Sequence, residues 1–101
     1  MARRKKRASA DEAAFIRAAD MLRVLAHPHR LRIIEFLDEL SEAPVHEIQD
    51  HWGLQQSSTS TYLTKMRRTG ILRTERRGKE VLYRVADSNA LTVLDCIRNE
   101  A

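Results

Sequence analysis

The most constraining part of the sequence is residues 45–69, which have the pattern of two helices joined by a glycine. The first helix carries apolar residues at helical spacing, namely Val45, Ile48 and Trp52. Gly53 is expected to end this helix and turn the chain, and Leu54 to pack inward. A second helix is predicted from about Gln56 to Thr69, where Gly70 stops it. Two helices connected by a tight turn of this kind form a helix-turn-helix.

The second of these helices is apolar along one narrow seam only. Leu63 and Met66 form the seam, helped by Thr59 and the ring of Tyr62. The remaining positions carry hydroxyls or cations: Ser57, Ser58, Ser60, Thr61, Thr64, Lys65, Arg67 and Arg68. A helix of this composition is anchored on one side, and its other side is available for a ligand.

Two helices are predicted before this motif. Ser9 and Glu12 have the spacing of a capping box, so the first helix should begin near residue 10. The pair His27-Pro28 ends it and can start the next, because proline is well tolerated at the first helical position. That second helix is apolar on more than one face, which is typical of a central helix. Its apolar residues are Leu31, Ile33, Ile34, Phe36, Leu37 and Leu40.

A hairpin and a last helix follow the motif. Residues 71–76 and 80–85 alternate with the period of strands around Arg77-Gly78-Lys79, and residues 41–44 are expected to be a loop. Asp87 or Ser88 can cap the last helix. The predicted order, α-α-α-α-β-β-α, is a mainly α winged helix-turn-helix domain over residues 9–101, with residues 1–8 as a disordered basic arm.

Positive charge is concentrated in two blocks, although the net charge is only +4. Residues 1–7 hold five basic side chains and no acid, and residues 62–84 hold eight basic and two acidic side chains. The segment between them, residues 8–61, is acidic. A polyanion such as nucleic acid responds to local cation density, so this distribution favours a nucleic-acid partner.

The size and composition of the chain fit a small cytoplasmic protein. A length of 101 residues is one domain, and no apolar run approaches the roughly 18 residues that span a membrane. Cys96 is the single cysteine, so no internal disulfide can form and a reducing compartment is expected. No Ser-His-Asp order, phosphate loop or carboxylate pair stands out, and catalysis is not expected.

The polar helix and the hairpin have the side chains that a DNA duplex requires. A major groove admits one α-helix, with short polar groups near base edges and cations near phosphates. Glutamine can reach an adenine edge through two hydrogen bonds. The predicted DNA-binding residues are Gln55, Gln56, Ser57, Ser58, Ser60, Thr61, Thr64, Lys65 and Arg68 on the helix, and Arg76, Arg77 and Lys79 on the hairpin.

Four stretches of the sequence resemble the ArsR/SmtB group of bacterial winged-helix repressors. They are LAHPHRLRIIEFL (25–37), VHEIQDHWGLQQSSTSTYLTKMRRTGIL (45–72), RRGKEVLYRV (76–85) and the closing apolar helix. The resemblance implies a homodimer on an inverted repeat in a promoter, released by an inducer that is often a metal ion. It also implies a dimer interface built from the first and last helices: Phe15, Ile16, Leu22, Leu91, Leu94 and Ile97.

The sequence departs from this group at several places. Thr59 replaces the usual valine or isoleucine, and Gln55 stands where a serine or threonine caps the recognition helix. Pro44 and His46 occupy the positions of the group's thiolate metal ligands, ahead of Glu47. At a second metal site of the group, Asp87 is retained, Asn89 replaces a histidine, and Glu100 is the best remaining candidate.

We therefore expect no cofactor and no metal, and the effector is unknown. His46, Asp50 and His51 form at most a loose surface cluster, and Cys96 is expected to be a small half-buried apolar residue. Three alternatives stay open: a winged helix that binds RNA, one that binds a protein, and a DNA-binding regulator without an effector.

Overall fold

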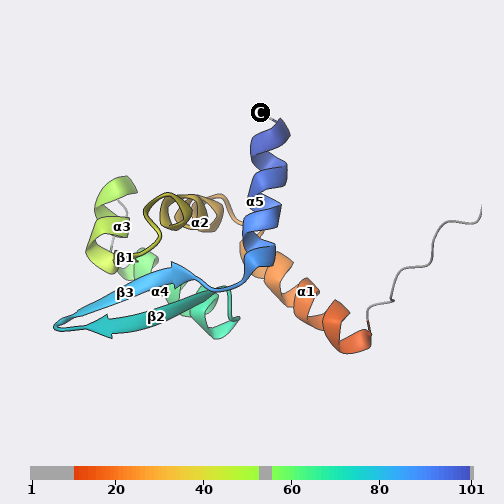
Figure 1. The fold of residues 1–101 in the computed structure, drawn as a ribbon, viewed down its shortest axis with the longest axis horizontal. Helices are drawn as coiled ribbons and strands as arrows, with labels where there is room; N and C mark the ends of the chain where they lie inside the picture. Colours follow the sequence, from red (N-terminus) through yellow and green to blue (C-terminus); the bar gives the residue numbers. More distant parts are fainter. Residues whose placement is uncertain (1–10, 53–55, 101) are drawn as a thin grey trace, which may run out of the picture.

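The computed structural model describes residues 11–52 and 56–100 (Figure 1). Two helices come first, α1 (Glu12–Leu25) and α2 (Pro28–Leu40), followed by the two-residue strand β1 (Ala43–Pro44). The helices α3 (Val45–Trp52) and α4 (Gln56–Arg68) precede the hairpin of β2 (Leu72–Arg77) and β3 (Glu80–Val85), and α5 (Ser88–Glu100) ends the chain. The predicted order of four helices, a hairpin and a last helix is confirmed, and β1 was not predicted.

The first helix is capped by a different residue from the one that the sequence pattern indicated. The side chain of Asp11 accepts a hydrogen bond from the backbone N–H of Ala14 at 2.8 Å, so Asp11 is the N-cap and the helix begins at Glu12. The expectation of a capping box from Ser9 is wrong for this reason, and Ser9 itself lies outside the described residues. The predicted start of α2 is confirmed, because His27 caps it and Pro28 is its first residue.

The core is built around α2, as its apolar pattern predicted. Ile33, Ile34 and Leu37 have almost no exposed surface. They pack with residues from every other helix and from the sheet, including Leu25, Ile48, Leu63, Met66, Leu72 and Leu94. α5 is also tied to α2 at the surface, because the Arg98 guanidinium lies 3.1 Å from Asp38 and 3.6 Å from Glu35.

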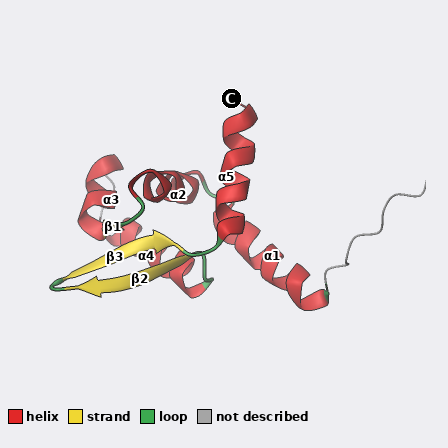
Figure 2. Cartoon of the chain, in the orientation of Figure 1, coloured by secondary structure: helices red, strands yellow, loops and turns green. Residues whose placement is uncertain are grey.

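The three strands form an antiparallel sheet in the order β1-β3-β2. Ala43 pairs with Tyr83 and Pro44 with Leu82, so β1 lies on the edge of the sheet, where a proline costs no ladder hydrogen bond. Thus the predicted loop over residues 41–44 is wrong for Ala43 and Pro44. The hairpin projects away from the helices, and its tip and the N-terminal end of α1 lie at opposite ends of the molecule (Figure 2).

The turn of the hairpin is set by one glycine. Arg77 pairs with Glu80, leaving Gly78 and Lys79 as a two-residue turn. Gly78 has φ +62°, the left-handed conformation that tight hairpin turns require and that glycine adopts without steric cost. We refer to β2, β3 and this turn as the wing. Within the described residues, no helix is long and apolar enough to cross a membrane.

Candidate nucleic-acid interface

α4 is held to the body of the protein by the predicted apolar seam. Thr59, Leu63 and Met66 are each at most 1% exposed, whereas Ser60, Thr61 and Lys65 on the other side are exposed. Helical spacing places the two sets on opposite sides, since residues three and four apart share a face. The polar side of α4 is thus directed to solvent, which is the arrangement that a DNA-reading helix needs.

An aromatic cluster fixes α4 against the start of α2. The ring of Tyr62 lies 5.0 Å from the ring of His27 and 5.8 Å from that of His29, measured between centroids. The guanidinium of Arg30 lies 5.3 Å from the Tyr62 ring and also donates to the carbonyl of Val24 at 3.0 Å. Together with the buried seam, these contacts fix the position of α4 against the body of the protein.

The C-terminal end of α4 is closed by the glycine that the sequence indicated. Gly70 has φ +85°, its N–H donates to the carbonyl of Arg67, and the N–H of Ile71 donates to the carbonyl of Met66. This pair of bonds is a Schellman motif, which satisfies carbonyls at the helix end. It also turns the chain toward β2, which begins at Leu72.

The exposed side of α4 forms a shallow hollow of about 490 Å³. We call it the polar face of α4, and its lining residues are Ser60, Thr61, Thr64, Lys65, Arg68 and Thr69. Lys65 and Arg68 make no ion pair with any residue that the structure describes, as is also true of the neighbouring Arg67. Cations without a protein partner are available to phosphates.

The structure describes the side chains of only some of the DNA-binding residues predicted on α4. Ser58, Ser60, Thr61, Thr64, Lys65 and Arg68 all lie on α4, with Ser58 and Thr64 partly buried. Gln55 lies outside the described residues, as do Gly53 and Leu54. Gln56 and Ser57 are in the first turn of α4, and their side chains are not described. Base contacts by these residues stay a prediction.

The wing supplies fewer available cations than expected. Arg77 is bound in a bidentate ion pair, with Nη1 2.5 Å and Nη2 3.1 Å from the two carboxylate oxygens of Glu42, and Nη2 also lies 3.0 Å from Glu75. The guanidinium of Arg77 holds the pKa of Glu42 below its ordinary value. By contrast, Arg76 and Lys79 are exposed and have no acidic partner among the described residues. Sequence inspection did not identify Glu42, which is 35 residues from Arg77.

The predicted dimer residues divide into two groups in the single chain. Phe15, Ile16, Leu22 and Ile97 are between 46% and 61% exposed. Leu91 is partly buried, and Leu94, at 4% exposure, belongs to the chain's own core. Leu94 thus has a packing role whether or not it reaches a second copy, and a charged residue there would damage the fold.

The residues present do not fit the thiolate metal site that the resemblance to the ArsR/SmtB group implies. A thiolate site requires sulfur ligands, and Pro44, which lies in β1, has none. Among residues 11–52 and 56–100, no three His, Cys, Asp or Glu side chains are grouped closely enough to hold a metal ion. Asp87 is used locally, since its carboxylate accepts a hydrogen bond from the N–H of Asn89 at 2.9 Å. Cys96 is exposed, rather than half-buried as expected.

The fold and the arrangement of α3, α4 and the wing define a winged helix-turn-helix protein. The sequence profile described as bacterial regulatory protein, arsR family, matches residues 27–74. The chain belongs to the ArsR family of bacterial regulatory proteins, which confirms the resemblance seen in the sequence.

Two relatives illustrate this membership. The HTH-type transcriptional repressor SmtB of Mycobacterium tuberculosis is 41% identical over 81 residues, which are 79% of this chain and 59% of that protein. The chain therefore spans less than two thirds of the SmtB repressor's length. The biofilm growth-associated repressor of Xylella fastidiosa is 32% identical, over 78% of this chain and 68% of that protein.

Solved structures show the same fold. The transcriptional repressor PagR of Bacillus anthracis superposes with a TM-score of 0.81 at 28% identity, covering 86% of this chain and 99% of that one. A homodimeric winged helix-turn-helix DNA-binding domain from Mycobacterium bovis has a TM-score of 0.75 at 22% identity, covering 92% of this chain and 87% of that one. At that identity the second likeness shows the fold alone.

Proposed function

We propose that this protein is a transcriptional repressor that binds a specific DNA duplex through α4 and the wing. The main support for the proposal is the polar face of α4, where Ser60, Thr61, Lys65 and Arg68 are exposed while the opposite seam is buried. Its hydroxyls are short enough to approach base edges, and its cations are suited to the flanking phosphates. The repressors among the relatives support the direction of regulation.

The working form is proposed to be a homodimer on an inverted-repeat operator. Phe15, Ile16 and Leu22 on α1 and Ile97 on α5 are large apolar side chains about half exposed in one chain. A second copy that covers them forms a two-fold symmetric dimer, the commonest homo-oligomer. Two α4 helices related by such an axis read two half-sites of opposite orientation, about one helical turn apart.

Selection from random duplexes with purified protein tests this proposal. The expected result is one sequence with two inverted half-sites, bound by two chains as measured by sedimentation. The double variant Lys65→Ala, Arg68→Ala should lose affinity for the selected site and for unrelated duplexes alike, because both cations face phosphates.

The matched control is Arg32→Ala, which removes an exposed cation of α2 that lines no part of the polar face. The control should bind as the wild type does. No enrichment of any duplex by the wild-type protein, or preferential binding of single-stranded RNA, would overturn the proposed function.

A further inference from the structure

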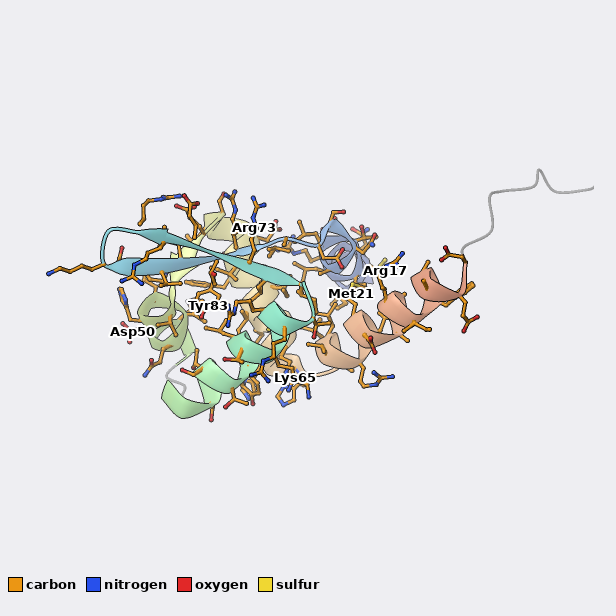
Figure 3. The ribbon with its side chains drawn as sticks, turned by 90° about the horizontal axis from the view of Figure 1, so that it is seen from below. Arg17, Met21, Asp50, Lys65, Arg73 and Tyr83 are labelled. Carbon is orange, nitrogen blue, oxygen red and sulfur yellow. The ribbon has the colours of Figure 1, made fainter. Side chains whose placement is uncertain are left out.

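A second hollow lies between α1 and α4. It has a volume of about 690 Å³, and Asp87 and Asn89 at the start of α5 also line it. Met21, Ala18 and Val24 of α1 supply its apolar lining, and four cations line it from the two helices: Arg17, Arg23, Lys65 and Arg68. Figure 3 views the side of the molecule where α1 and α4 lie next to each other, with Arg17, Met21 and Lys65 labelled. We call this hollow the α1–α4 groove.

The groove has a surplus of positive charge after its internal pairs are counted. Arg23 is neutralised by Asp20, whose carboxylate lies 2.8 Å from its guanidinium. The second acid of the groove, Asp87, accepts the helix-capping hydrogen bond at the start of α5. Arg17, Lys65 and Arg68 form no ion pair within the described residues, so three cations face one unpaired acid. Such a surface is complementary to an anion.

The groove is continuous with the polar face of α4. Lys65, Arg68 and Thr69 line both hollows, and they form the rim between them. A polyanionic strand that passes Lys65 and Arg68 on leaving the polar face would next meet Arg17 on α1. A duplex backbone is such a strand, because it presents a phosphate every few ångströms along its length.

We propose that the α1–α4 groove is a further contact for the DNA backbone, in which Arg17 binds a phosphate. This inference rests on the proposed function and extends the DNA-binding surface to a helix outside the helix-turn-helix. α1 then has two roles on two faces. Arg17 and Met21 face the groove, and the exposed Phe15 and Leu22 remain for the second copy.

The test measures DNA binding of the full chain by fluorescence anisotropy between 50 and 200 mM salt, on the selected duplex and on an unrelated one. Arg17→Gln should weaken binding to both by at least about fivefold to tenfold at roughly 0.1 M salt, because each chain of the dimer loses one phosphate contact. The slope of log K against log salt should become shallower by about 0.9 for each chain, which is about 1.8 for the dimer. Arg17→Lys, which keeps the charge, should retain the slope, and Arg32→Gln should change neither quantity.

Several outcomes would overturn the inference alone. One is that Arg17→Gln keeps the wild-type DNA affinity and salt slope, although the Lys65, Arg68 double variant loses binding. The groove would then bind a free anion or contact the second copy, and not the DNA backbone. Another is loss of binding by Arg17→Gln that sedimentation traces to dissociation into monomers. Failure of the wild-type chain to select any duplex would instead remove the proposed function itself, and the two failures are therefore distinguishable.

Discussion

The recognition helix and the wing are both cationic, but they are positioned in different ways. α4 is fixed by buried contacts at Leu63 and Met66, and its exposed cations have no acidic partner among the described residues. The wing has a largely exposed hairpin, and one of its cations, Arg77, is bound to Glu42 and Glu75. Exposed positive charge alone therefore does not identify a phosphate contact. A cation already bound by an acid of the same chain, such as Arg77, must give up that ion pair before it can bind DNA.

The largest effect is expected in the buried seam. Leu63→Ala removes a side chain that is 1% exposed, and it should lower the free energy of unfolding by about 2–5 kcal/mol. Chemical denaturation followed by circular dichroism measures this change. The exposed Lys65→Ala, two positions along the same helix, is the control and should change stability by less than about 0.5 kcal/mol. Equal losses for the two variants would mean that α4 is not anchored on one side.

A smaller effect is expected on the salt dependence of DNA binding when two arginines of the wing, Arg76 and Arg77, are replaced one at a time. Arg76→Ala should weaken binding to every duplex alike and make the salt slope shallower by about 1 for each chain of the dimer, because this side chain is free to meet a phosphate. Arg77→Ala should leave the slope almost unchanged, since its guanidinium is already bound by two carboxylates. Salt titrations of the two single variants measure the difference. A slope that falls equally in both would show that Arg77 leaves Glu42 when DNA binds.

The smallest effect is the pH dependence of the Glu42–Arg77 ion pair. Arg77 lowers the pKa of Glu42 from its ordinary value of 4.5, so the folded chain binds this proton less readily than the unfolded chain. The stabilisation from the pair is therefore fully present above about pH 4.5 and is lost as the pH falls through the lowered pKa. Arg77 is exposed and Glu42 is only partly buried, so the effect should be small and reduced by salt.

Thermal unfolding of Glu42→Gln beside the wild type measures this effect. The difference in Tm should be seen at pH 7 and should disappear under acidic conditions. Asp20→Asn, which breaks the exposed Arg23–Asp20 pair within α1, is a control that does not involve the wing. A Tm difference for Glu42→Gln that grows on acidification would contradict the assigned pairing.

The local pattern of the sequence predicted most of the fold. The seam of α4, the stop at Gly70, the start of α2 at His27-Pro28 and the turn at Gly78 all depend on neighbouring residues, and each is found where the pattern placed it. The N-cap at Asp11 differs from the pattern because Ser9 and Asp11 are both suitable N-cap residues, and the spacing of Ser9 to Glu12 favours the wrong one. β1 was missed because two residues ending in a proline carry no strand signal.

The candidate site was predicted less completely, because part of it depends on contacts between distant segments. Glu42 and Arg77 are far apart in sequence, and no local pattern pairs them. Arg17 was not identified because α1 comes next to α4 only in the folded chain. Leu94 was assigned to the dimer interface because the resemblance to the ArsR/SmtB group implies one built from the first and last helices. An apolar pattern cannot distinguish a side chain buried within one chain from one buried by a second copy.

Parallel DNA selection with the wild type and Thr61→Ala tests whether the polar face of α4 reads the sequence of a duplex. Thr61 is exposed on that face, and each lost base contact should cost roughly 1–3 kcal/mol of discrimination. We expect relaxed base preference at the same position of both half-sites, with the remaining positions unchanged. An identical selected site for the two proteins would contradict it.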